Sequence, residues 1–96
     1  MITENERAGI DKLSRFQIET LLAYDYVGRN KPATAHLLHI SYYCVCQDLL
    51  YVRVKTGLNP VVKEDCDRLV KIINEIRKEK DGRDTLPLEV FFGEEP

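Results

Sequence analysis

Two histidines and two cysteines lie close together in the middle of the sequence, and these residue types can bind zinc. His36 and His39 are three residues apart, and Cys44 and Cys46 follow shortly after them. The spacing differs from that of zinc fingers and ribbons, and a Cys-x-Cys pair on a helix directs its thiols to different faces. We therefore expect no metal and no other cofactor. An odd total of three cysteines also predicts reduced, mostly buried thiols rather than a disulfide framework.

No motif in this sequence indicates a catalytic site. It contains no nucleophile–base motif, no glycine-rich phosphate loop and no pair of carboxylates in a plausible pocket. The sequence therefore predicts that the protein is not an enzyme.

Another group of side chains has the chemistry of DNA contacts. Hydroxyl and amide groups can read base edges or phosphates, and here they belong to Ser41, Tyr42, Tyr43 and Gln47. Basic groups that can clamp phosphates belong to Arg29, Lys31, Arg53 and Lys55. The alternative is that the tyrosines are surface or dimer-contact residues and that the basic residues are simply solvated.

Length and charge limit what these residues can do. A chain of 96 residues has room for one domain, which we place at residues 1–84, with a strand or tail at 85–96. The net charge is −2, but up to Pro60 there are seven Lys/Arg against six Asp/Glu, so the acidic excess lies further on. A DNA-binding face would therefore be local. The absence of a long apolar run and the polar N-terminus predict a cytoplasmic protein without a membrane partner.

Capping signals and apolar spacing divide the chain into helices. Capping boxes at Thr3/Glu6 and Ser14/Gln17 predict helices over about 4–12 and 15–27. Pro32 suits the first position of a short helix that ends near His39. Two longer helices are expected over residues 42–56 and about 61–79.

The boundaries of the 42–56 helix and the character of the last stretch need a separate argument. Ser41 is a good N-cap and Gly57 a natural C-terminal stop, and fifteen unbroken residues exceed a usual strand. Residues 85–92 favour a β-strand, which would have to pack on the helices, pair with its equivalent in a dimer, or remain a tail.

The order of these helices predicts a helix-turn-helix at residues 20–58. A small helix that crosses the next one closely needs small side chains, and Ala35 is its pivotal position. Ile40 supplies an apolar plug in the break, and the following helix projects its first turns outward. The expected fold is mainly α: a trihelical core, with or without a wing, a long C-terminal helix and a short C-terminal strand.

The sequence also resembles a known family. Thr20-Leu21-x-Ala23-Tyr24, Asn30-x-x-Ala33-Thr34-Ala35-x-x-Leu38-x-Ile40 and Thr56-Gly57-Leu58-Asn59 resemble the C-terminal helix-turn-helix domain of PucR-type transcriptional regulators over residues 20–60. A weaker resemblance to LuxR-type domains rests on Leu13-Ser14, Ile40-Ser41 and Lys55-Thr56-Gly57-Leu58. These resemblances imply a trihelical DNA-binding fold, usually dimeric, in a bacterial or phage-derived regulator.

The resemblance does not extend to the DNA-contacting side chains. Where the family has a His-Arg-Asn-Thr-like run followed by Tyr-Arg, this chain has Ser41-Tyr42-Tyr43-Cys44 and Gln47-Asp48. The main hypothesis is a small regulator or accessory factor that binds double-stranded DNA as a homodimer. The alternative is a helix-turn-helix that has lost DNA binding and docks on a protein partner. The acidic balance, Asp48 and the cluster of Tyr42, Tyr43 and Tyr51 favour this alternative.

Overall fold

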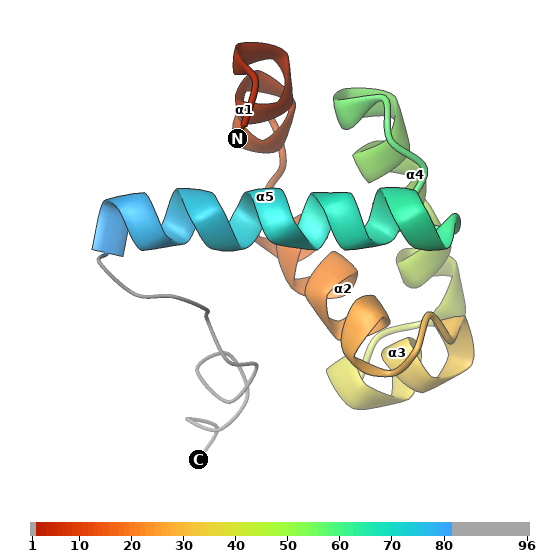
Figure 1. Ribbon diagram of the computed structural model, residues 1–96. Helices are drawn as coiled ribbons and strands as arrows, with labels where there is room; N and C mark the ends of the chain where they lie inside the picture. Colours follow the sequence, from red (N-terminus) through yellow and green to blue (C-terminus); the bar gives the residue numbers. More distant parts are fainter. Residues whose placement is uncertain (1, 82–96) are drawn as a thin grey trace.

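The computed structural model describes residues 2–81, and this part of the chain is mainly α-helical (Figure 1). Its helices are α1 (Glu4–Asp11), α2 (Arg15–Tyr26), α3 (Lys31–Leu38), α4 (Tyr42–Thr56) and α5 (Lys63–Asp81). The helices predicted from the sequence are therefore confirmed, with boundaries that differ by at most two residues. The predicted strand at 85–92 lies outside the described residues, and no strand occurs within residues 2–81.

Side-chain capping explains where the first helices begin. Both capping boxes are formed: the Thr3 and Ser14 hydroxyls accept from the backbone N–H groups of Glu6 and Gln17, whose side chains accept from the cap residues in return. Each box satisfies two of the backbone donors that a helix start leaves unpaired. These caps fix the positions at which α1 and α2 begin.

The connection from α2 to α3 turns through two residues with positive φ. Gly28 has a φ of 75° and Arg29 a φ of 60°, and their backbone N–H groups donate to the carbonyls of Asp25 and Tyr24. This is the Schellman pattern of a helix end. The Asn30 side chain then caps α3, which begins at Lys31. Pro32 is therefore the second helical residue rather than the first, because Asn30 provides a cap one residue earlier than expected.

The turn between α3 and α4 consists of His39, Ile40 and Ser41. His39 adopts the left-handed conformation with a φ of 57°, and Ile40 packs against the core. The Ser41 hydroxyl accepts from the Cys44 N–H, and α4 stops at Gly57, whose φ is 79°. The predicted plug, N-cap and C-terminal stop of this region are confirmed.

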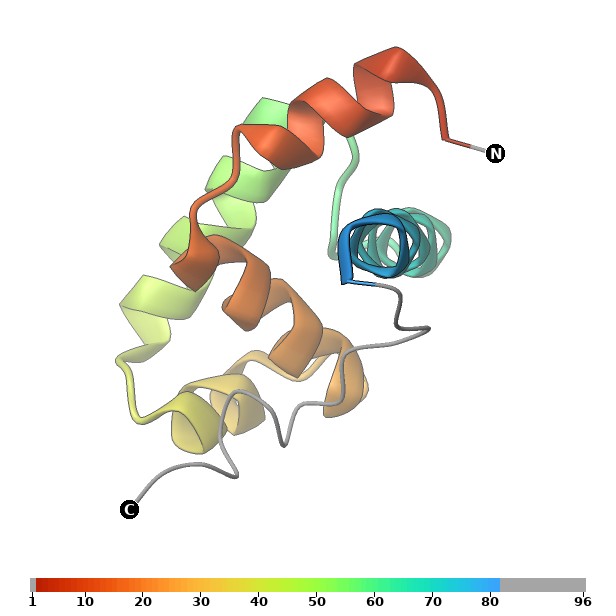
Figure 2. The same cartoon turned by 90° about the vertical axis from the view of Figure 1, so that its left-hand side faces the viewer.

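The core lies where α2, α4 and α5 converge. Fully buried side chains include Leu21 from α2, Val45 and Val52 from α4, and Leu69 and Ile72 from α5. On α5 the buried residues recur at helical spacing, so one face of this helix covers the core. Figure 2 shows α5 end-on, on the opposite side of α2 from α4.

Helix α1 is fastened to both α4 and α5. The Arg68 guanidinium donates to both Glu6 carboxylate oxygens, at 2.8 and 2.6 Å, and a second ion pair joins Arg7 to Glu79. The Arg68 guanidinium lowers the pKa of Glu6 from its ordinary value to about 2. On its other side α1 meets α4 at Gly9, where an added Cβ would lie 3.0 Å from the Thr56 Cα. Glycine permits this close approach of two backbones.

Candidate nucleic-acid interface

The first turns of α4 project from the scaffold and carry four of the predicted DNA-contacting residues. Ser41, Tyr42 and Tyr43 are exposed and Gln47 is half-buried. The Ser41 hydroxyl is engaged as the N-cap of the helix, which leaves its proton available as a hydrogen-bond donor. We call Ser41, Tyr42, Tyr43 and Gln47 the leading surface of α4. It offers hydroxyl and amide groups and has no charge of its own.

Tyr42 is positioned by contacts at the beginning of its helix. A side-chain hydrogen bond with Cys46, one turn further on, raises the pKa of Tyr42. Burial raises the pKa of Tyr24 in α2, and Cys66 and Tyr42 act in the same direction whereas Arg29 lowers it. Tyr42 and Arg29 therefore both lie near Tyr24, although 13 positions separate them in sequence.

The two basic residues near the α2–α3 connection are half-buried, so they are not the fully solvated cations of the alternative interpretation. Arg29 is half-buried, and its charge acts on Cys66 and Lys63 at the beginning of α5 as well as on Tyr24. Lys31 is the half-buried first residue of α3. Arg29 and Tyr42 both act on Tyr24, so Arg29 can flank the leading surface.

Asp48 does not face outward as the sequence suggested. Its carboxylate accepts a hydrogen bond of 2.7 Å from the Thr20 hydroxyl, which is almost fully buried on α2. The Asp48 carboxylate therefore contacts α2. Asp48 is the one acidic residue between Ser41 and Thr56, so no exposed carboxylate of α4 stands beside the leading surface. This orientation removes one of the arguments for the protein-docking alternative.

The last two turns of α4 hold the other basic residues, and only one of these projects freely into solvent. The Lys55 ammonium donates to the Lys12 carbonyl at 3.0 Å and to the Gln17 side chain at 3.1 Å, and it lies 5.8 Å from the centre of the Tyr51 ring. Lys55 therefore ties α4 to the α1–α2 junction. Arg53 is exposed. The site residues are thus split between the two ends of α4, which is about 22 Å long at 1.5 Å per residue.

The outward side of the second half of α4 is apolar. Leu50, Tyr51 and Val54 are 49%, 47% and 71% exposed, and we call these three residues the outer patch. The sequence analysis grouped Tyr51 with Tyr42 and Tyr43 as evidence for a protein partner, but it did not single out Leu50 or Val54. The available signal was that the helix is apolar on more than one face, which is typical of a helix with a second partner.

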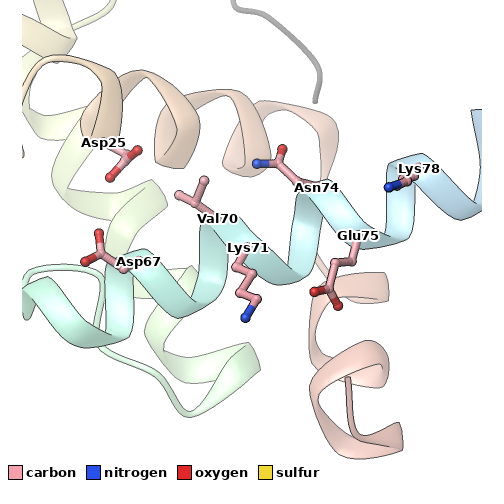
Figure 3. Close-up of a pocket in the computed structure, with 7 residues that line it drawn as sticks. All are labelled: Asp25, Asp67, Val70, Lys71, Asn74, Glu75 and Lys78. Carbon is pink, nitrogen blue, oxygen red and sulfur yellow. The ribbon is translucent and has the colours of Figure 1, made fainter. Parts of the chain in front are cut away.

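A shallow hollow of about 380 Å³ runs along α5 (Figure 3). Carboxylates, amines, an amide and one aliphatic side chain line it, from Asp25, Asp67, Val70, Lys71, Asn74, Glu75 and Lys78. In Figure 3 Asp25 and Asp67 approach each other at one end, while Lys71 and Glu75 point away from Asn74. None of the predicted DNA-contacting residues lines this hollow. Its mixed charges match no single ligand class.

The three cysteines are free and occupy different environments. Cys44 is exposed, which corrects the expectation of mostly buried thiols, because it lies on the outward side of the first turn of α4. Cys66 is buried, and burial together with the nearby Asp25 carboxylate raises its pKa to about 12. Within residues 2–81 no group of three or more His, Cys, Asp or Glu side chains is arranged to hold a metal ion.

No family model, curated protein or solved structure matches this chain. Among the helices described for residues 2–81, none is both long and apolar enough to cross a lipid bilayer. The functional argument therefore depends on the geometry of α4 and its neighbours.

Proposed function

We propose that this chain is a small helix-turn-helix protein that binds double-stranded DNA by placing the leading surface of α4 in the major groove. The observation that carries the proposal is the exposed, acid-free beginning of α4, held at a fixed angle by a short turn and a buried scaffold. Helices α3 and α4 correspond to the two helices of the motif, and α2 supports both. A three-residue turn between them has the length that this motif requires.

The chemistry of the leading surface supports contacts to DNA. The hydroxyl groups of Tyr42 and Tyr43 and the amide of Gln47 can bond to base edges or phosphate oxygens. The N-terminus of α4 adds unpaired backbone N–H groups, which favour a phosphate. Arg29 near Tyr24, Lys31 at the beginning of α3 and Arg53 in the last turn of α4 supply positive charge.

The proposal includes a regulatory role and a dimer. The resemblance of residues 20–60 to PucR-type domains supports a role as a transcriptional regulator or a DNA-binding accessory factor of bacterial or phage origin. A single helix-turn-helix buries little DNA surface, so a homodimer that reads two half-sites gives useful affinity. Few basic residues flank the leading surface, and we therefore expect modest affinity with a shallow dependence on salt.

The direct test is a fluorescence-anisotropy titration of the full chain with labelled genomic fragments over a series of salt concentrations. We expect binding that weakens linearly in log–log form as salt rises. The double variant Tyr43→Ala with Gln47→Ala should lose at least about tenfold in affinity, since each base contact contributes about 1–3 kcal/mol. Tyr26→Ala is the matched control, because Tyr26 is 71% exposed on α2 and Tyr43 is 68% exposed on α4.

Two results would reject the proposal. Absence of binding at low salt, for every fragment, would exclude DNA as the ligand. Equal loss in the Tyr26 and Tyr43 variants would show that the leading surface is not the contact. Arg53→Ala tests phosphate clamping without damage to the fold, whereas Lys55→Ala does not, because Lys55 has structural bonds.

The second candidate function is docking on another protein, and the outer patch is the observation that favours it. Three adjacent apolar or aromatic side chains on one exposed helix face are typical of a protein contact. In this case Val54→Glu would abolish partner binding and leave the DNA titration unchanged.

A further inference from the structure

We infer that Leu50 contacts the 5-methyl group of a thymine, on the base pair next to the one that Gln47 contacts in the major groove. The inference rests on the proposed function and names a base that α4 selects. Leu50 is 49% exposed although its side chain is wholly apolar. A thymine methyl group gives it an apolar partner within the DNA itself.

Leu50 lies on the same exposed side of α4 as Tyr43 and Gln47. At about 100° per residue, these three positions fall within about 60° of one another around the helix axis. Tyr43 is 68% exposed and Gln47 is half-buried. The buried residues Val45 and Val52 lie about half a turn away, on the side that faces the core. A groove that receives Tyr43 and Gln47 therefore also meets Leu50.

The spacing of Gln47 and Leu50 along α4 corresponds to neighbouring base pairs. Three residues advance a helix by about 4.5 Å, and successive base pairs of B-DNA are about 3.4 Å apart. Val54 lies a further 6 Å or about one turn along the axis, outside this pair of base pairs. When α4 lies in the groove, one base pair therefore faces the Gln47 amide and the next faces the Leu50 side chain.

The major-groove edge of thymine offers the apolar group that a leucine can cover. Thymine presents a methyl group there, whereas the edges of guanine, adenine and cytosine present hydrogen-bond acceptors and donors. Leu50 has no hydrogen-bonding group, so covering one of those polar edges would leave a donor or an acceptor without a partner. An apolar side chain at this position therefore selects thymine.

The residues on either side of Leu50 suit the phosphates that border the groove. Around the helix axis the exposed Arg53 lies about 80° to one side, and Tyr51, which is 47% exposed, lies about 80° to the other. A guanidinium and a phenolic hydroxyl can both donate to phosphate oxygens. The Asp48 carboxylate is bound to the Thr20 hydroxyl, away from this side. This distribution of charge favours DNA over a protein as the partner of Leu50.

Replacement of thymine by uracil tests the inference, because it removes the 5-methyl group and keeps the base pair. In a duplex that the chain binds in the anisotropy titration, full replacement should weaken binding about fourfold for each contacted methyl group, as expected for burial of one such group. Leu50→Ala should bind the thymine duplex more weakly and lose most of the response to uracil. Val62→Ala is the matched control, because Val62 is 42% exposed before the beginning of α5, and it should keep the full response.

Replacement of one thymine at a time locates the contact. The loss should be confined to a thymine beside the base pair whose exchange weakens the wild type but not Gln47→Ala. Equal binding of the thymine and uracil duplexes, or a full response that persists in Leu50→Ala, would overturn the inference and leave the proposed function standing. Absence of binding to every duplex would overturn both. Circular dichroism confirms that each variant is folded.

Discussion

The two ends of α4 have the same helical geometry but opposite relations to the rest of the molecule. At its beginning, Val45 packs in the core and Tyr42 lies near Tyr24 of α2, and the exposed side of the helix is polar. Its end is locked: Lys55 bonds to the α1–α2 junction, and the backbone at Thr56 meets Gly9. This difference shows that the basic residue Lys55 has a structural role at the end of α4. The neutral residues of the leading surface, at the beginning of α4, are the ones available to a ligand.

The largest expected effect is a difference in the free energy of unfolding between substitutions on the inward and the outward side of α4. Leu49 is 3% exposed and its neighbour Leu50 is 49% exposed. Leu49→Ala should lower the free energy of unfolding by about 2–5 kcal/mol, because it leaves a cavity in the core. Leu50→Ala should change it by less than about 0.5 kcal/mol, since that side chain is at the surface. Urea unfolding of both variants checks the pair, and equal losses would contradict the assigned orientation of α4.

The next effect concerns the backbone contact at the end of α4. Gly9→Ala places a methyl group 3.0 Å from the Thr56 Cα and 3.2 Å from the Lys55 carbonyl oxygen, and neither backbone atom can move aside cheaply. We expect a loss of about 1–3 kcal/mol, although alanine favours an isolated helix by about 1 kcal/mol. Thermal unfolding measures the sign. A stabilised variant would show that α1 does not approach α4 this closely.

A smaller effect distinguishes the two basic residues near the end of α4. Lys55→Ala should cost about 1 kcal/mol of stability, because it removes hydrogen bonds to the Lys12 carbonyl and the Gln17 side chain. Arg53→Ala should leave stability within about 0.5 kcal/mol and reduce DNA affinity instead. Parallel unfolding and anisotropy measurements check both. The reverse pattern would exchange the roles assigned to these residues.

The smallest effect is a pH dependence of the attachment of α1 to α5. The pKa of Glu6 falls from its ordinary 4.5 to about 2, chiefly through its hydrogen bonds from Arg68. Because the folded-state pKa is the lower one, this contribution is present above pH 4.5 and is lost as the pH falls toward 2. Glu6→Gln keeps the capping geometry and removes the charge.

The control for this pH dependence is the difference in stability between wild type and Glu6→Gln. That difference should be constant near neutral pH and shrink below pH 4.5. A difference that does not change with pH would show that the Glu6–Arg68 pair is absent in solution.

Local signals predicted most of the helical structure. The capping boxes at Thr3 and Ser14, the N-cap Ser41 and the stop at Gly57 depend on short-range hydrogen bonds and on backbone conformations that glycine favours. Such features are encoded within a few residues, and the helices accordingly begin and end close to the predicted positions. The mainly α fold follows from them.

Contacts between distant segments explain what sequence analysis missed at the site. Asp48 was taken for a surface acid, yet it lies one turn from Val45 and Val52, and its orientation depends on Thr20, 28 residues earlier. Lys55 was taken for a phosphate clamp because its partners, the Lys12 carbonyl and Gln17, belong to another element. Gly9 had no local signal, since its role is the space it leaves for α4.

The central claim is that the first turns of α4 contact the ligand. An NMR titration of the full chain, with a DNA duplex that it binds in the anisotropy titration, tests this claim most directly. Backbone amide shifts should change at residues 41–47 and around Arg29 and Lys31, while residues along α5 stay unchanged. Shifts confined to α5 or to the outer patch, with none at Tyr42, Tyr43 and Gln47, would contradict the account.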